Sequence, residues 1–324
     1  GPDAYSLSGW RGGGWRKALK DADLPCEGLC AVGDFGFDSG LEAARALGER
    51  GYSVTLAEAG SELGGRVAHE ARLPGLATWG RVRDYREQQF IRLTNVEVYR
   101  ESALTAAHVL EFAVPRVVLA TGATWRRDGI GHEHVLPISG ADGANVYTPD
   151  DLFAGATLNG PVVVYDDDHY YMGGVVAEKL RADGNQVTLV TTAGLVSLWT
   201  ERTLEQHLIQ RRILEAGIDV RVSTNLTGFD GATATLACGF TGKPSTIACA
   251  AVVSVTARLS QDTLYHDLMG EGSAGVGNAS VTRLGDCLAP GTIAAAVHSG
   301  HWYARDLDSP DQGIVSHRRE RAMV

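Results

Sequence analysis

A strand–helix–strand pattern occurs twice in this chain and constrains its fold more than any other feature. The first copy covers residues 29–59 and the second covers residues 161–193. In each copy an apolar strand precedes a helix with apolar residues at helical spacing, and a second buried strand follows, as in a parallel βαβ unit. The repetition predicts an α/β protein with two Rossmann-like dinucleotide-binding domains, arranged as a glutathione-reductase-like pair.

The order of the remaining segments predicts that the second domain is inserted in the first. The first unit lacks its closing strand and helix until residues 281–308, where VTRLGD predicts a strand and TIAAAVHSGHWYARDLD a helix. We expect an N-terminal arm over 1–28, an FAD/ADP-binding-type domain over 29–157 plus 281–324, and an inserted NAD-binding-type domain over 158–280. The other expected elements are helices over 78–93 and 201–217, and strands over 96–102, 116–123 and within 218–258.

Composition and charge argue against several classes of partner. The chain has 324 residues and a formal net charge of −10, which disfavours nucleic acid and anionic membranes as partners. No uncharged apolar stretch reaches the ~18 residues of a transmembrane helix, and the N-terminus lacks the apolar centre of a signal peptide, so we expect a cytoplasmic protein. The five cysteines fit neither a disulfide framework nor a zinc site, and no metal site is expected.

The turn after the first strand is expected to bind nucleotide, although its sequence is unusual. Gly33, Gly36 and Gly40 have the spacing G-x2-G-x3-G, which is longer than the G-x-G-x-x-G of a dinucleotide-binding loop. The turn also carries two aspartates, which would repel a pyrophosphate, and two bulky phenylalanines. By position it is a nucleotide loop, and the alternative is a loop that has lost its nucleotide affinity.

A carboxylate follows at the position expected for ribose recognition. Glu58 ends the second strand close to ~20 residues after the glycine loop, where a carboxylate bonds the ribose hydroxyls and disfavours a 2′-phosphate. The alternative is a solvated strand end. In the next turn Gly64 and Gly65 would let the backbone wrap around the cofactor, and Arg66 could offset pyrophosphate charge.

The corresponding turn of the second unit is a poor site for NAD. Residues 166–174 read DDDHYYMGG, with three acidic residues and no G-x-G. The D-x-D pattern also suggests a divalent cation, but no further ligand pattern follows. The alternative is a helix N-terminus capped by carboxylates.

Two further groups of residues leave alternatives open, and neither yields a catalytic residue. His298 and His301 share a helix face, which suggests metal binding or proton transfer, but without a carboxylate or third histidine nearby in sequence packing or contact with a cofactor is favoured. The helix at 78–93 carries Trp, Tyr and Arg side chains that fit a partner surface or an ordinary amphipathic helix equally well.

Several long segments resemble the C-terminal half of the trimethylamine/dimethylamine dehydrogenase family, which includes histamine dehydrogenase and NADH:flavin oxidoreductases. The matching segments are 39–66, 73–86, 120–129, 162–180 and 285–308. Members carry an N-terminal FMN barrel and a four-cysteine [4Fe-4S] segment, which this sequence lacks. The resemblance implies that FMN and [4Fe-4S] belong to a partner, either a separate barrel subunit or a missing N-terminal half. An electron-transfer flavoprotein is a further candidate partner.

The same resemblance implies which residues hold FAD or ADP. Gly40, Glu58, Gly65 and Arg66 would line the adenosine and pyrophosphate, while Thr121, Gly122, Gly285 and Asp286 would close the site. The implied function is a flavoprotein oxidoreductase component that acts with an FMN/iron–sulfur partner in amine oxidation or demethylation and electron transfer. One alternative is a nucleotide-free scaffold or interaction module, and another is a stand-alone FAD-dependent NAD(P)H reductase.

Overall fold

The computed structural model describes residues 28–35, 39–270 and 279–309, and the expected arm at 1–28 lies almost wholly outside them. The chain divides into two compact units. Unit 1 comprises the described parts of residues 1–68, 80–122 and 260–324, and unit 2 comprises residues 69–79 and 123–259. The chain is a mixed α/β protein with parallel sheets in both units.

The sheet of unit 1 has its first strand near the centre. The strand order is β13-β4-β1-β2-β3, and β14 also pairs with β4. The β1–β2, β2–β3, β1–β4 and β4–β14 pairs are all parallel. The strands are β1 (Gly28–Phe35), β2 (Val54–Glu58), β3 (Val96–Tyr99), β4 (Arg116–Trp125), β13 (Arg258–Ser260) and β14 (Ser280–Arg283).

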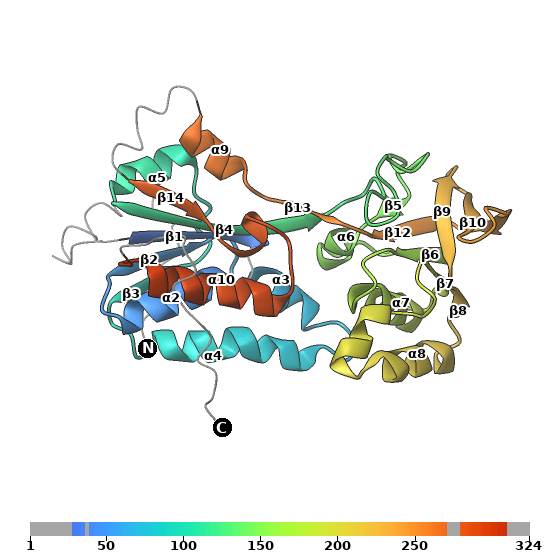
Figure 1. Cartoon of the computed structure of the whole chain (residues 1–324), viewed down its shortest axis with the longest axis horizontal. Helices are drawn as coiled ribbons and strands as arrows, with labels where there is room; N and C mark the ends of the chain where they lie inside the picture. The colour runs from blue at the N-terminus through green and yellow to red at the C-terminus, as the bar shows by residue number, and fades with distance from the viewer. Residues whose placement is uncertain (1–27, 36–38, 271–278, 310–324) are drawn as a thin grey trace. The chain divides into compact units, whose positions relative to one another are not determined.

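Helices cover both faces of this sheet. Figure 1 shows α2, α4 and α10 on one side and α5 and α9 on the other. Side-chain alternation along β4 agrees: Val118 packs with the core under α2 and α10, while Val117 and Leu119 pack with the core under α5 and α9. The helices of unit 1 are α2 (Ser39–Glu49), α4 (Gly80–Phe90), α5 (Ala106–Phe112), α9 (Thr263–Met269), α10 (Ile293–Asp306) and the 3-10 turn η4 (Gly285–Cys287). The helix α3 (Gly65–Glu70) begins in unit 1 and ends in unit 2, and the 3-10 turn η2 (Ala77–Trp79) lies in unit 2.

Unit 2 contains a five-stranded parallel sheet and a three-stranded antiparallel sheet. The parallel order is β5-β12-β6-β7-β8, and the antiparallel order is β11-β10-β9. Val162 and Val164 of β6 pack with α7 and α8, whereas Val163 and Tyr165 pack with β9 and β10. The elements are β5 (Val146–Tyr147), α6 (Pro149–Phe153), β6 (Pro161–Asp166), α7 (Met172–Ala182), β7 (Gln186–Thr191), η3 (Leu198–Thr203), α8 (Gln206–Glu215), β8 (Asp219–Arg221), β9 (Thr224–Phe229), β10 (Thr233–Cys238), β11 (Pro244–Ala248) and β12 (Ala251–Val255).

Two expected elements differ from those observed. The single helix expected over 201–217 is a 3-10 turn, η3, followed by the shorter α8, because Leu204 between them has the left-handed φ of 62° that ends a helical segment. The strand expected to run to Asp286 ends at Arg283, and Gly285, with a φ of 57°, starts the turn η4 instead.

The division into units also differs from the expected boundaries at 157/158 and 280/281. Residues 123–157 belong to unit 2, because β5 pairs with β12 and the side chains of Trp125 and Leu152 lie in the core of that unit. Unit 2 ends at Leu259, and α9 packs in unit 1.

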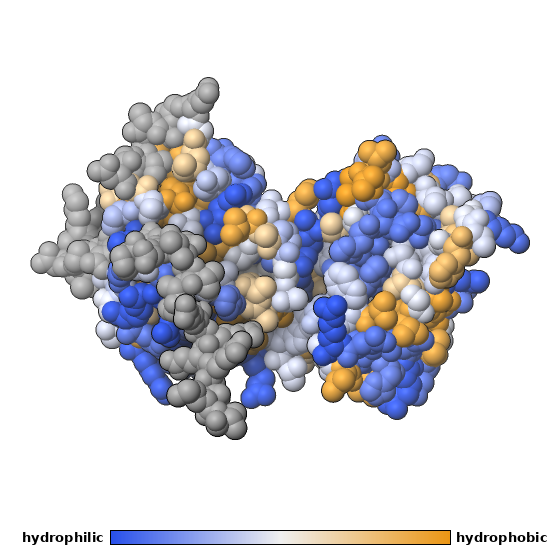
Figure 2. Space-filling view, viewed as in Figure 1, coloured by the Kyte–Doolittle hydropathy of each residue, from blue (hydrophilic) through white to orange (hydrophobic). Residues whose placement is uncertain are grey.

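The molecular surface mixes polar and apolar residues. Figure 2 shows hydrophobic patches separated by hydrophilic residues on the visible face. Val135, Leu136 and Phe240 of unit 2 are among the most exposed large hydrophobic residues. In the part of the chain that the structure describes, every helix is too short or too polar to cross a membrane.

Candidate functional site

The predicted site residues of unit 1 gather at the carboxyl edge of its parallel sheet. Chain order reverses at β1, since β2 and β3 follow on one side and β4 lies on the other. Open α/β sheets bind ligands at such a switch point. Val32 pairs with Glu58, and Phe35 pairs with Gly122, so Glu58 and Gly122 flank the end of β1. Gly33 lies within β1, which runs to Phe35, and Gly36 falls outside the described residues.

Glu58 is a buried carboxylate rather than a solvated strand end. Its side chain has no exposed surface. One carboxylate oxygen, Oε1, accepts a hydrogen bond of 3.0 Å from the Gly60 backbone N–H, and the Glu58 carbonyl accepts one of 2.7 Å from Ser102. The first bond orients the Glu58 side chain, and the second holds the backbone at the end of β2.

The glycine pair after β2 forms a left-handed turn against α4. Gly64 and Gly65 have φ angles of 98° and 47°, a region that glycine adopts without steric cost. A Cβ on Gly64 would lie 3.0 Å from Cδ of Arg83, so the arginine stem covers this turn. Arg66 follows in α3 and is buried, with Nη1 3.5 Å from Oδ2 of Asp286. Part of its charge is therefore balanced within the protein.

The segment after β14 meets the start of α2. Gly285 packs so closely on Ser39 that a Cβ there would collide with the serine hydroxyl. Asp286 is buried, and its Oδ1 accepts a 2.8 Å hydrogen bond from the Gly291 backbone N–H. Arg66 and Asp286 therefore link the Gly64–Gly65 turn to the start of the C-terminal helical segment.

Thr121 and Gly122 form a second group at the end of β4. The Thr121 hydroxyl hydrogen-bonds the Gln261 carbonyl, and its oxygen lies 3.1 Å from Sγ of Cys287. Gly122 has a φ of 79°, and its carbonyl accepts a 2.8 Å hydrogen bond from the Gln261 N–H. Burial raises the pKa of the Cys287 thiol, which keeps it protonated and unreactive. The predicted residues thus lie in two adjacent groups joined through residues 285–287.

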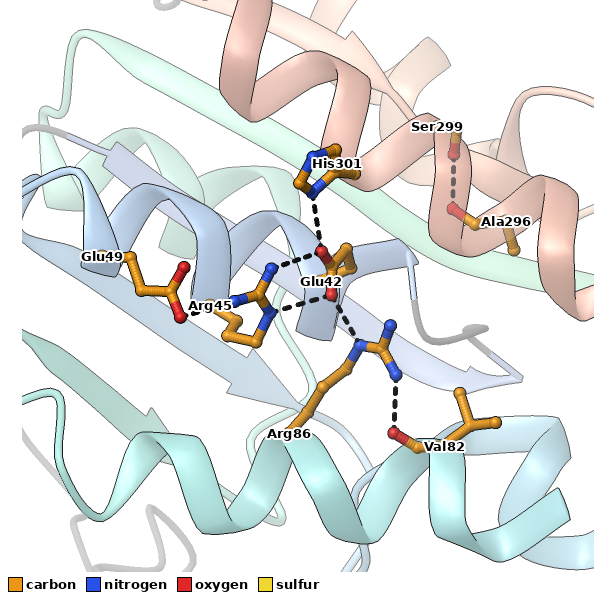
Figure 3. Close-up of polar contacts among 8 residues, drawn as sticks. All are labelled: Glu42, Arg45, Glu49, Val82, Arg86, Ala296, Ser299 and His301. Carbon is orange, nitrogen blue, oxygen red and sulfur yellow. Dashed lines mark hydrogen bonds and ion pairs between the residues drawn. The ribbon is translucent and has the colours of Figure 1, made fainter. Parts of the chain in front are cut away.

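Sequence reasoning missed a buried cluster around Glu42 in the first turn of α2 (Figure 3). Arg45 donates to its carboxylate at 2.7 and 3.0 Å, Arg86 of α4 at 2.9 Å, and Nδ1 of His301 on α10 lies 2.9 Å away. Burial raises the pKa of Glu42, but the bonds from Arg45, Arg86 and His301 outweigh it and leave the pKa below its usual value. The one sequence signal was the Glu–Arg pair three residues apart on a helix.

His301 thus contacts a carboxylate with a side chain that is 43% exposed, whereas His298 is exposed, with its ring near Trp302. On α4, Arg83 bonds Asp84 and Glu62, while Tyr85 is half exposed. The helix therefore carries internal contacts together with an exposed aromatic residue.

The acidic turn of unit 2 is occupied by contacts within the chain. Asp166 and Asp167 are fully buried. Oδ1 of Asp166 accepts from the His169 N–H at 3.1 Å, while Asp167 accepts from the Glu133 N–H at 3.0 Å and the Thr192 hydroxyl at 3.1 Å. The N-cap of α7 is Tyr171, which makes no side-chain cap bond, while the Asp166 carboxylate lies against Gly173 in the first turn of this helix.

Replacing Asp166 by Asn should change how stability depends on pH. Burial, and then repulsion by Asp168 and Asp167, raises the pKa of Asp166 well above its usual value. Between the unfolded pKa near ~4 and this raised pKa, only the folded state holds the proton, so the wild type loses stability as pH rises. The Asp166→Asn variant should therefore gain stability relative to the wild type from pH 5 to pH 8 in urea unfolding.

The matched control for this prediction is Asp230→Asn. Hydrogen bonds from the backbone of Ala232 and Thr233 lower the pKa of Asp230, so it is ionised in both states over this pH range. The difference in free energy of unfolding between Asp230→Asn and the wild type should stay constant from pH 5 to pH 8. A constant difference for Asp166→Asn as well would contradict the prediction.

Comparison with known proteins finds similar proteins that align with most of this chain. A family model described as the OYE-like second alpha/beta domain matches residues 147–228. Dimethylamine dehydrogenase from Hyphomicrobium sp. (strain x) is 35% identical over 313 residues, which cover 87% of this chain and 42% of that protein. The solved structure of histamine dehydrogenase from Rhizobium sp. 4-9 has a TM-score of 0.84 and 46% identity, covering 89% of this chain and 45% of that one.

A more distant structure shares the fold alone. Thioredoxin reductase from T. acidophilum has a TM-score of 0.56 at 14% identity, covering 87% of this chain and 98% of that one. The chain spans less than half the length of the two amine dehydrogenases that it matches. Its relatives are thus members of the dimethylamine and histamine dehydrogenase family.

Proposed function

We propose that unit 1 binds an adenine nucleotide, as ADP or as the ADP part of FAD, and that the chain is a component of an amine-oxidising flavoprotein. The observation that carries this proposal is the position of buried Glu58 beside the end of β1, at the edge where chain order reverses. A carboxylate at this place suits the ribose hydroxyls of an adenosine. The amine dehydrogenases among the relatives support the oxidoreductase part.

The two units are proposed to be Rossmann-like domains of one two-domain flavoprotein fold. Each has a parallel sheet whose chain order reverses beside its first long strand, β1 in unit 1 and β6 in unit 2. The likeness to thioredoxin reductase, which covers nearly all of that chain, supports this pairing. Only unit 1 is proposed to bind nucleotide, because the corresponding turn of unit 2 contains buried acids.

The residues of unit 1 fit the parts of an adenine nucleotide. Glu58 would accept hydrogen bonds from the ribose hydroxyls, and its charge would disfavour a 2′-phosphate. The start of α2 at Ser39 and Gly40 would place a helix N-terminus near the pyrophosphate, where Arg66 adds positive charge. If FAD is the ligand, its isoalloxazine ring supplies the electron-transfer chemistry, and the chain's residues bind and orient it.

The proposed partner is an FMN/iron–sulfur barrel, as a separate subunit or as another part of a longer chain. The lengths of the amine dehydrogenases, more than twice the matched part, support this proposal. A nucleotide-free module is the second candidate function. It is favoured by the internal pairing of Arg66 with Asp286, which uses charge that a pyrophosphate would need.

The test is an absorbance spectrum of the purified protein, then chromatography of released nucleotide and calorimetric titration with ADP. We expect bound FAD or ADP, or ADP binding that at 100 times its dissociation constant adds ~2.7 kcal/mol to stability. Glu58→Gln should weaken ADP binding about tenfold or more, because a hydrogen bond to a charged group is lost. Glu62→Gln, at a half-exposed position in the next loop, is the control. No released nucleotide and no ADP binding would favour the nucleotide-free module.

A further inference from the structure

The proposed nucleotide site has little positive charge of its own to offer a pyrophosphate. Among the described residues assigned to it, the charged ones are Glu58, Arg66 and Asp286, and all three are buried. Arg66 lies 3.5 Å from Asp286, so its charge is partly balanced, and the carboxylate of Glu58 adds negative charge. A strongly negative ligand therefore favours a further cation beside the site. Arginine suits this task best, because its planar fork of N–H donors fits phosphate oxygens in pairs.

Arg83 of α4 lies directly against the glycine turn of this site. Cδ and Cγ of Arg83 would both lie 3.0 Å from a Cβ placed on Gly64, and Cβ of Arg83 would lie 3.1 Å from it. Gly64 has no side chain, so the arginine stem can pack on the left-handed turn without a clash. Because Nε is bonded to Cδ, the guanidinium begins one bond beyond this contact. The charged group is therefore beside the backbone segment that would approach the nucleotide.

The Arg83 guanidinium is held by carboxylates that are half exposed. Nε and Nη2 donate to Oδ1 of Asp84 at 2.9 and 2.8 Å, while Nη1 lies 3.4 Å from Oε2 of Glu62. The Arg83 side chain is 24% exposed, and those of Asp84 and Glu62 are 49% and 50% exposed. Ion pairs with such exposed partners contribute little to stability. A phosphate oxygen can therefore replace the loose contact of Nη1 with Glu62 at small cost.

Arg86, one turn further along α4, is held in the opposite way. Its side chain is buried, with Nε 2.9 Å from the Glu42 carboxylate and Nη1 2.6 Å from the Val82 carbonyl oxygen (Figure 3). Glu42 is itself buried and also accepts from Arg45. Arg86 is thus committed to a buried cluster, whereas Arg83 has a donor that can change its partner.

We propose that Arg83 binds the pyrophosphate of the nucleotide in unit 1. This inference rests on the proposed function of that unit. Asp84 keeps the guanidinium beside the glycine turn through Nε and Nη2, and Nη1 exchanges Glu62 for a phosphate oxygen. Arg83 thus adds the positive charge that Arg66, paired with Asp286, supplies only in part.

The experiment is calorimetric titration of the whole chain, freed of any retained nucleotide, with ADP and with adenosine. Arg83→Met keeps an unbranched stem over Gly64 and removes the charge. It should weaken ADP binding about tenfold or more, because a hydrogen bond between charged groups is lost. Adenosine binding should stay unchanged, because adenosine has no phosphate. Arg83→Lys should restore part of the affinity for ADP, since lysine keeps the charge but not the paired donors.

Arg50→Met is the matched control, because Arg50 is 33% exposed and pairs with the half-exposed Asp308 beyond the C-terminal end of α2. It should bind ADP like the wild type. Glu62→Gln should not weaken ADP binding, since a phosphate oxygen takes over its contact. Unchanged ADP affinity in Arg83→Met, or an equal loss for ADP and adenosine, would overturn the inference while leaving the nucleotide site intact. Absence of ADP and FAD binding in the wild type would instead overturn the proposed function, and the inference with it.

Discussion

Replacing Glu42 by Ala should lower the free energy of unfolding by about 3–5 kcal/mol, as expected when one partner of a buried ion pair is removed. Arg45 and Arg86 would remain buried without their shared carboxylate. Arg45 would keep Glu49, but Arg86 would keep only the 2.6 Å bond to the Val82 carbonyl among the bonds that the structure describes for it. Urea denaturation followed by circular dichroism measures the loss.

An exposed ion pair provides the control for this prediction. Glu215 lies 3.7 Å from Arg211, and both side chains are about two-thirds exposed, at 68% and 66%. Glu215→Ala should therefore change stability by less than about 0.5 kcal/mol. The double variant Glu42→Met/Arg86→Met should lose less than Glu42→Ala, because it removes one uncompensated charge. A loss below ~1 kcal/mol in Glu42→Ala would contradict a tightly coupled buried cluster.

The parallel sheets could be predicted from the sequence because their strands carry apolar residues on both faces. The strands β2, β6 and β12 are short runs of mostly apolar residues between turns, and every residue in them except Pro161 at the start of β6 is buried. The order of strands and helices then indicated two parallel units. The missed break at Leu204 is different, since no glycine or proline marks the left-handed residue there.

The Glu42 cluster could not be predicted, for a reason visible in α2. Helical spacing assigned one apolar face to Leu41, Ala44 and Leu47, which implies an exposed polar face. The structure buries every residue from Ser39 to Gly48, because α4 and α10 cover the polar face as well. Arg86 and His301 are far from Glu42 in sequence, so only tertiary structure brings them together.

The position of the candidate site could be predicted from the sequence, but the ion pair between Arg66 and Asp286 within it could not. The strand end predicted Glu58 as a site residue, and the family resemblance implied Gly122 and Gly285. In the structure Glu58 and Gly122 flank the end of β1, and Gly285 packs on Ser39 at the start of α2. The sequence assigned Arg66 to a pyrophosphate, yet this side chain lies beside Asp286. Opposite charges separated by more than 200 residues give no local signal of their contact.

Gly140→Ala should be strongly destabilising in unit 2, by about 2–5 kcal/mol. Gly140 has a φ of 77°, which costs an alanine about 1–2 kcal/mol. Its Cβ would also collide with the Phe229 carbonyl, where the backbone is held by the 2.9 Å hydrogen bond from the Phe229 N–H to the Ser139 carbonyl. Overpacking against fixed backbone adds about 1–3 kcal/mol.

Gly155→Ala separates the clash from the backbone strain. Gly155 has a similar φ of 94°, but nothing lies within 4 Å of a Cβ placed there. The free energy of unfolding of this variant should therefore fall only by the conformational cost of about 1–2 kcal/mol. Urea unfolding measures the loss of unfolding free energy in each variant, and the difference between the two losses is the cost of the steric clash at Gly140. Equal losses would mean that the segment around Ser139 moves away from β9 without cost, and that its pairing with Gly228 does not hold this side of unit 2 together.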